Sequence, residues 1–147
     1  MSPYENQRLS AGYRPQGASV AERSLPDFNL SNLTKELFDT IADKCAKIIA
    51  ASSDSINKPT QIRRFYDELV MWNDRAAVSE KAFTDALPFV YMIKSKVAYA
   101  KGRKNVDETF QKFIDKTIGQ IVDRKTLNNA KLFMEAVMGF YKQYKKD

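Results

Sequence analysis

Apolar residues recur at intervals of three and four along most of this chain, a spacing typical of helices with one buried face. The first stripe begins after Ser31 and should end near Ser52–Ser55, where the pattern breaks. A second helix should open at Pro59 and continue to Trp72, before a loop over 73–78. The buried positions expected in these two helices are Leu37, Ile41, Cys45, Ile48 and Ile49, and then Ile62, Phe65, Tyr66, Leu69 and Trp72.

A third helix is predicted after Ser79, whose hydroxyl can cap the first turn. Pro88 should then kink the chain or start the next helix, because proline has no backbone N–H to donate. The fourth helix contains the basic segment Lys94–Lys104 and should stop at Gly102, a residue type common at helix C-termini. Its expected core-facing residues are Val90, Ile93, Val97 and Ala100.

Two further helices complete the pattern. Asp107 is the expected cap of the fifth, and the last should begin near Lys125 or Thr126 and end in a basic tail. Their apolar stripes are Phe110, Phe113, Ile114, Ile118 and Ile121, and then Leu127, Ala130, Phe133, Met134, Val137, Met138 and Tyr141. Since no repeat and no convincing strand is found, the sequence predicts an all-α, compact bundle of five or six helices.

Residues 1–30 lack this helical period. They contain three prolines and two glycines among many polar residues, and their charges cancel. Such composition predicts a flexible N-terminal arm beside a helical bundle domain of residues 31–147. An arm ordered by a partner is the alternative, with Tyr4, Arg8, Tyr13 and Arg14 as the contacting residues.

The residue types present exclude several kinds of chemistry. The chain has no histidine, which excludes histidine bases, Ser–His or Cys–His nucleophile pairs and histidine metal ligands. The single cysteine, Cys45, lies on an apolar stripe and is expected to be a core thiol. No glycine-rich phosphate-binding motif occurs. We therefore predict no enzymatic activity, no cofactor and no metal. The lack of a long apolar run further predicts a soluble, cytoplasmic protein.

Basic charge is concentrated in one segment. The net charge is +6 at pH 7, and Lys94–Lys104 contributes five basic residues and no acid. On a helical wheel Lys96, Tyr99 and Arg103 fall within about 60° of each other, away from the core-facing arc. Lys94 and Lys101 lie at the edge of that arc, where long side chains can reach water. This pattern is typical of a surface that binds phosphates, with a tyrosine available for stacking.

Other interpretations of the basic residues remain open. A lysine-rich helix end can be a solvated surface or can bind an acidic protein partner. Arg63 and Arg64 are weaker candidates for nucleic-acid binding, because Asp67 and Glu68 lie four residues later and can pair with them.

Three blocks of sequence together carry a family resemblance. They are TQIRRFYDELVMW at Thr60–Trp72, KSKVAYAKGRK at Lys94–Lys104 and MEAVMGFYK at Met134–Lys142. In this order and spacing, on an all-α chain, they resemble the small subunit of type III-A CRISPR effector complexes, the Csm complexes. The resemblance extends over about residues 57–144, and its most specific part is KVAYAKGR. The N-terminal arm is longer and more polar than the family pattern, and its role is unassigned.

The resemblance implies a non-catalytic subunit of an antiviral ribonucleoprotein. Several copies would stack along the inner filament, beside the backbone subunits and next to the large subunit, and contact guide RNA and target RNA. Base pairing would then select the target. Carried over to this chain, the RNA-binding candidates are Lys94, Lys96, Tyr99, Lys101, Arg103 and Lys104, with Arg63 and Arg64 as weaker ones.

Two other function classes fit the same residues. A helical DNA-binding regulator would need polar residues at the start of its recognition helix, whereas the basic helix begins with apolar residues. A protein-only adaptor would use the basic surface to dock an acidic partner.

Overall fold

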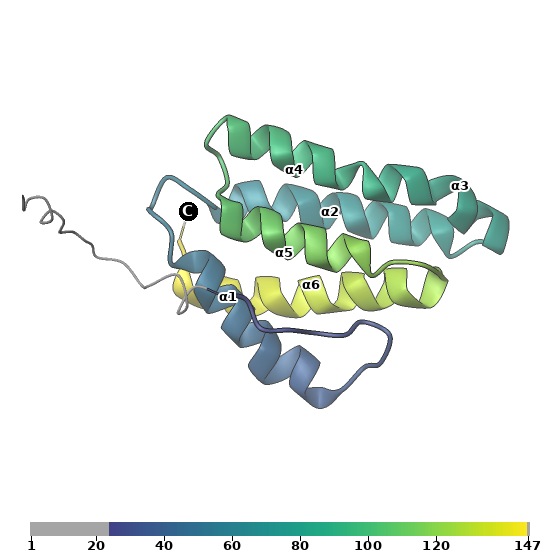
Figure 1. Ribbon diagram of the computed structural model, residues 1–147. Coiled ribbons are helices and arrows are strands. Elements are labelled where there is room, and N and C mark those ends of the chain that lie inside the picture. The colour runs from purple at the N-terminus through teal and green to yellow at the C-terminus, as the bar shows by residue number, and fades with distance from the viewer. Residues whose placement is uncertain (1–23, 147) are drawn as a thin grey trace, which may run out of the picture.

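The computed structural model describes residues 24–146, which form helices and loops without a strand (Figure 1). A π-helical turn, η2, is followed by six α-helices within this range. In chain order the elements are η2 (Leu37–Ile41), α1 (Ala42–Ala50), α2 (Pro59–Ala76), α3 (Glu80–Tyr91), α4 (Ile93–Gly102), α5 (Glu108–Gly119) and α6 (Arg124–Tyr144). The predicted all-α fold is confirmed.

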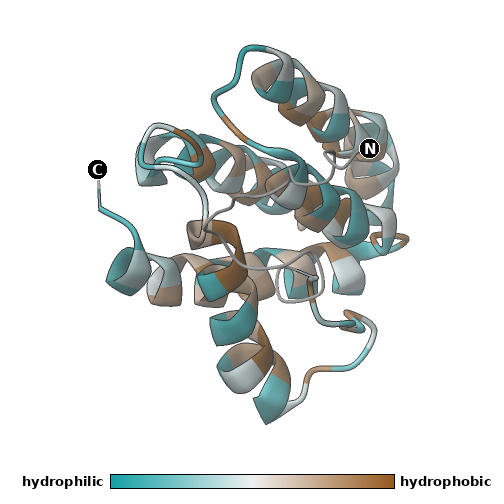
Figure 2. Ribbon diagram, turned by 60° about the vertical axis from the view of Figure 1, so that its left-hand side comes forward, coloured by the Kyte–Doolittle hydropathy of each residue, from teal (hydrophilic) through white to brown (hydrophobic). Residues whose placement is uncertain are grey.

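The helices pack as a layered bundle. The long helix α6 contacts α1 on one side and α2 on the other, while α2 also contacts α3, and α4 packs against α5. Helix α4 continues from α3 in nearly the same direction in Figure 1. Polar and apolar residues alternate around each helix, as expected for helices with one buried face (Figure 2).

Most residues of the predicted apolar stripes form one continuous core, whereas Ile41, Tyr66, Trp72 and Met138 are only partly buried against it. Phe110, Phe113, Phe133 and Tyr141 are among its largest fully buried side chains. Cys45 is fully buried, and its burial raises the pKa of the thiol to about 12. The expectation of a core thiol is therefore confirmed. None of the helices between residues 24 and 146 combines the length and apolarity that a bilayer span requires.

Side-chain caps fix the starts of three helices. Ser79 Oγ accepts a hydrogen bond from the Ala82 N–H at 3.0 Å, and Asp107 Oδ1 accepts one from Phe110 N–H at 3.0 Å. Both caps were predicted from the sequence. Asp123 caps α6 in a reciprocal capping box with Thr126, so this helix begins at Arg124.

Two local predictions are wrong. The expected loop over 73–78 begins later, because α2 continues to Ala76, which is buried at 1% exposure. Tertiary packing thus extends the helix beyond its last clear sequence signal. Pro88 lies inside α3, so the alternative in which it starts the next helix is wrong, and the break comes four residues later at Met92. The kink at Pro88 stays a prediction.

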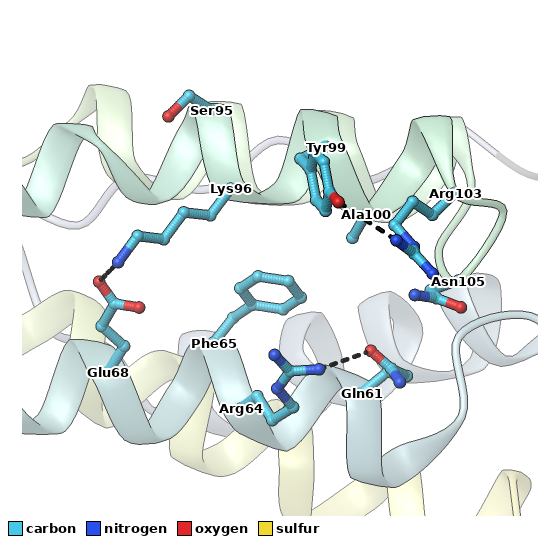
Figure 3. A pocket seen from close by; sticks show the side chains of 10 residues that line it. All are labelled: Gln61, Arg64, Phe65, Glu68, Ser95, Lys96, Tyr99, Ala100, Arg103 and Asn105. Carbon is cyan, nitrogen blue, oxygen red and sulfur yellow. Dashed lines mark hydrogen bonds and ion pairs between the residues drawn. The ribbon is translucent and has the colours of Figure 1, made fainter.

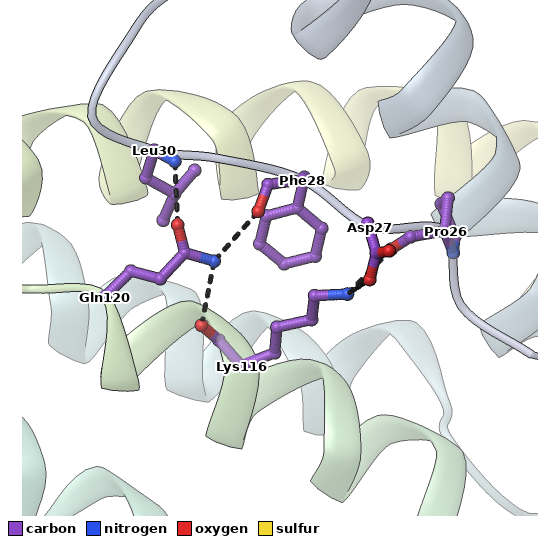
Figure 4. Close-up of polar contacts among 6 residues, drawn as sticks. All are labelled: Pro26, Asp27, Phe28, Leu30, Lys116 and Gln120. Carbon is purple, nitrogen blue, oxygen red and sulfur yellow. Dashed lines mark hydrogen bonds and ion pairs between the residues drawn. The ribbon is translucent and has the colours of Figure 1, made fainter.

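The segment 26–30 packs onto the bundle between α5 and α6 (Figure 4). The Leu30 N–H donates to Gln120 Oε1 at 2.8 Å, and Gln120 Nε2 donates to the Phe28 carbonyl at 3.1 Å. Phe28 and Leu30 both belong to the core, at 8% and 0% exposure. The arm boundary predicted at residue 30 is therefore wrong for this segment. Residues 1–23 of the predicted arm, including Tyr4, Arg8, Tyr13 and Arg14, lie outside the described residues.

Candidate nucleic-acid interface

An open cleft of about 720 Å³ lies between α2 and α4 (Figure 3). Residues spaced three and four apart on each helix point into it, because such residues share one helical face. The lining residues are Gln61, Arg64, Phe65 and Glu68 from α2, and Ser95, Lys96, Tyr99, Ala100, Arg103 and Asn105 from α4 and the turn after it. The helical wheel drawn from the sequence thus groups Lys96, Tyr99 and Arg103 correctly.

Three cations and one carboxylate set the charge of the cleft. Arg103 Nη1 donates to the Tyr99 hydroxyl at 3.2 Å, with the guanidinium 5.8 Å from the ring centroid. Arg64 Nη1 donates to Gln61 Oε1 at 3.4 Å. Because both partners are neutral, these hydrogen bonds orient the two guanidinium groups without cancelling their charge.

Lys96, unlike Arg64 and Arg103, is paired with a carboxylate. Its Nζ donates to Glu68 Oε2 at 2.7 Å, and the side chains are 48% and 20% exposed. The sequence suggested that Glu68 pairs with Arg64, and this is wrong. Glu68 instead accepts from Lys96 on α4 and, at 3.4 Å, from the Trp72 indole. The sequence could not have revealed this pair, since it depends on how α2 and α4 pack together.

The other basic residues of the predicted segment do not line the cleft. Lys94 is half-buried, and its Nζ lies 5.2 Å from the Tyr91 ring centroid. Lys101 is exposed near Glu108 of α5, whose pKa is lowered by Lys112 first and by Lys101 to a lesser extent. Lys104 belongs to the turn that leads from α4 to α5.

That turn has a feature that the sequence did not predict. Gly102 is the last residue of α4, as expected, but the left-handed backbone conformation belongs to Lys104, with φ of 64°. The Asn105 N–H closes the helix end by donating to the Ala100 carbonyl at 2.9 Å. A side chain at Gly102 would meet nothing within 4 Å, so the surface is open at this position.

Arg63 borders a separate hollow of about 530 Å³ between α2 and α6. It pairs with Asp67 at 3.7 Å, as the spacing in the sequence predicts. The eight candidates therefore divide into two groups. Arg64, Lys96, Tyr99 and Arg103 meet in the cleft, whereas Arg63, Lys94, Lys101 and Lys104 lie outside it.

Metal-dependent chemistry has no candidate site in the described part of the chain. Among residues 24–146, no three His, Cys, Asp or Glu side chains gather closely enough to hold a metal ion. The carboxylate that lines the cleft, Glu68, is already bonded to Lys96 and Trp72.

Comparison with known proteins gives a family match over most of the chain. The family model described as Csm2 Type III-A matches residues 32–147. No significant match is found among curated proteins or among solved structures. The matched range includes α2 and α4 and therefore every residue that lines the cleft.

Proposed function

Because this chain belongs to the Csm2 family of small subunits from type III-A CRISPR complexes, we propose that it is a non-catalytic subunit that contacts RNA. Several copies stack along the inner filament of the complex, beside the backbone subunits and next to the large subunit. Each copy presents the cleft between α2 and α4 to the backbone of the guide RNA and target RNA. The complex acts in the cytoplasm.

One observation carries this proposal. Arg64, Lys96 and Arg103 reach the same open cleft from two helices, with the Tyr99 ring beside them (Figure 3). All three cations stand on or directly beside helices, which fixes the backbone positions from which their side chains reach a phosphate backbone. Tyr99 is 67% exposed and can stack on a base or a sugar. Such a surface recognises charge and shape, and it does not select a base sequence.

A single copy is expected to bind RNA weakly. The three cations can neutralise at most about three phosphates, and Glu68 offsets part of their charge. Stacked copies would contact one RNA repeatedly and raise the affinity through effective concentration. The isolated protein should therefore show salt-sensitive binding that tolerates any RNA sequence.

The first test replaces two of the cations. We expect Lys96→Glu combined with Arg103→Glu to lower the affinity for single-stranded RNA more than tenfold at low salt. The double variant removes two phosphate contacts and adds two repulsive charges. Fluorescence anisotropy with labelled RNA measures the affinity, and circular dichroism checks that the helical content is unchanged.

A matched control separates the cleft from net charge. Lys81→Glu combined with Lys112→Glu changes the net charge equally, at exposed ion pairs on α3 and α5. This control should retain most of the RNA affinity. Equal losses in the two double variants would mean that net charge governs binding. Unchanged affinity in the Lys96 and Arg103 variant would contradict the proposal.

The two competing functions have weaker support. Helix α4 follows α3 directly through Met92, and its first residue, Ile93, is buried. That end is therefore not free to enter a DNA major groove as a recognition helix does. A protein-only adaptor would bind no RNA in the anisotropy experiment.

A further inference from the structure

A partly exposed aromatic stack adjoins one end of the cleft. Trp72 from α2 and Phe89 from α3 lie face to face, with ring centroids 5.1 Å apart and planes inclined by 11°. The Arg75 guanidinium lies 5.0 Å from the centroid of the Trp72 ring. Phe89 and Met92 are each 48% exposed. We call these four residues, Trp72, Arg75, Phe89 and Met92, the aromatic ledge.

The aromatic ledge is connected to the cleft on both helices. Glu68 Oε2 accepts hydrogen bonds from Trp72 Nε1 and from Lys96 Nζ, so one carboxylate joins the two sites. On the other wall Met92 precedes Lys96 by four residues, and the Lys96 N–H donates to the Met92 carbonyl at 3.2 Å. This bond keeps the two residues one helical turn apart, or about 6 Å. A strand that lies in the cleft therefore passes within reach of the ledge.

We propose that the aromatic ledge stacks an unpaired base of the RNA strand whose phosphates lie in the cleft. This role rests on the proposed RNA binding. It further specifies the ligand as single-stranded RNA with accessible bases. Stacking on aromatic rings tolerates any sequence, because every base has a π face. Contacts with Phe89 and Glu68 already fix the indole, so little conformational entropy is lost on binding.

Charge favours a nucleic acid over an apolar protein surface at this ledge. The Arg75 guanidinium lies over the Trp72 ring, and Lys96 shares the Glu68 carboxylate with the Trp72 indole, so a partner that covers the rings also meets both cations. A nucleotide suits the cations through its phosphate and the rings through its base. The core of a protein interface is depleted of lysine, whereas a phosphate backbone favours both Lys96 and Arg75.

The test compares two RNAs of equal length, an oligoadenylate and its abasic counterpart, which keeps every phosphate and ribose. Trp72 is the single tryptophan of the chain, so its emission reports on the ledge without a label. We expect the oligoadenylate to bind about tenfold more tightly than the abasic strand, in line with stacking of one base. We also expect only the oligoadenylate to quench the emission of Trp72.

Variants of Phe89 then assign the effect to the ledge. Phe89→Ala should lower the affinity for oligoadenylate about tenfold and leave the affinity for the abasic strand unchanged. Phe89→Tyr retains a ring and should retain the wild-type affinity. Val122→Ala is the matched control, because Val122 is an exposed apolar residue, at 67%, between α5 and α6. It should change neither affinity.

The outcomes separate this proposal from the proposed function. Equal binding of both strands by the wild type, with unchanged Trp72 emission, overturns the stacking role and leaves the cleft as an RNA site. Failure of the wild type to bind either strand overturns both. If Phe89→Ala binds RNA normally but no longer assembles with neighbouring subunits, the ledge is a protein interface and the stacking role is wrong.

Discussion

Among single residues, Glu68 has the most consequence for the cleft, because it adds negative charge to a surface that is otherwise cationic. Its carboxylate lies 2.7 Å from Lys96 Nζ and is only 20% exposed. A phosphate that binds Lys96 must compete with this carboxylate and is repelled by it. Glu68 also accepts from the Trp72 indole, so the same side chain positions the aromatic ring. Glu68 therefore weakens the binding of phosphate at Lys96 while it holds the Trp72 ring in place.

These two effects lead to a prediction for Glu68→Gln. The substitution removes the negative charge but keeps an oxygen that can accept from Trp72. We expect the RNA affinity to rise about two- to fivefold at low salt, the size expected from one partly exposed charge pair. Anisotropy titrations measure this rise. Asp85→Asn makes the same charge change at the exposed pair with Lys81 on α3 and should have a smaller effect. A fall in RNA affinity for Glu68→Gln would mean that the Lys96 contact positions the binding site.

The residues of the cleft show what a sequence can predict at this scale. Lys96, Tyr99 and Arg103 follow from helical spacing alone, since they share one face of one helix. The partner helix does not follow from spacing, and neither does the Glu68 contact with Lys96. For the same reason the sequence predicts Lys94 and Lys101 as RNA-binding candidates, although both lie outside the cleft. Helical spacing in the sequence predicts which residues share one face of a helix. Only the tertiary structure shows which other helix that face contacts.

At the scale of elements, short polar signals locate some helix starts: Ser79 and Asp107 are predicted caps, Asp123 is not, and α1, α2 and α4 have no side-chain cap. Ser79, Asp107 and Asp123 cap α3, α5 and α6 by accepting backbone hydrogen bonds near the start of each helix. Such caps act within three or four residues, so they can be recognised in sequence. Helix ends depend more on packing, as Ala76 at the end of α2 illustrates. Pro88 is tolerated inside α3, where buried residues lie on both sides of it, at Ala86 and Val90.

The cap of α6 provides a prediction about stability and its pH dependence. Hydrogen bonds from the Thr126 N–H and hydroxyl lower the pKa of Asp123. A lowered pKa in the folded state stabilises the protein above the unfolded pKa of about 3.9. This stabilisation is lost as the pH falls through the lower folded value. Asp123→Ala should therefore reduce the free energy of unfolding by about 1 kcal/mol at pH 7, and by progressively less below about pH 4.

Urea unfolding followed by circular dichroism at pH 7 and at pH 3 measures this cap. Asp115→Ala is the control, because Asp115 is exposed on α5 and outside its first turn. Its effect should stay within about 0.5 kcal/mol at both pH values. An equal loss of stability for Asp123→Ala at pH 7 and pH 3 would show that the ionised carboxylate is not what stabilises the helix start.

For the molecule as a whole, the sequence predicted the helical class but misplaced one boundary of the bundle. Residues 26–30 have no helical period, and their composition resembles that of a flexible arm. Their packing depends instead on two apolar side chains and on amide groups contributed by distant helices. Gln120 and Asn129 bond the backbone of Phe28 and Leu30, across about ninety residues of sequence. No local pattern encodes contacts between residues this far apart.

If this segment is part of the core, removing its side chains must destabilise the whole bundle. Phe28 packs on Phe133, with ring centroids 4.6 Å apart, and Phe28→Ala should cost about 3 kcal/mol of unfolding free energy. Leu30→Ala should cost a similar amount, because Leu30 is fully buried. Leu33→Ala removes the same atoms three residues later, where the side chain is 46% exposed, and should cost less than about 1 kcal/mol. Urea unfolding monitored by Trp72 emission measures all three variants. If Phe28→Ala lowers the free energy of unfolding no more than Leu33→Ala does, residues 26–30 are not part of the core. They then belong to the flexible arm, as their composition alone predicts.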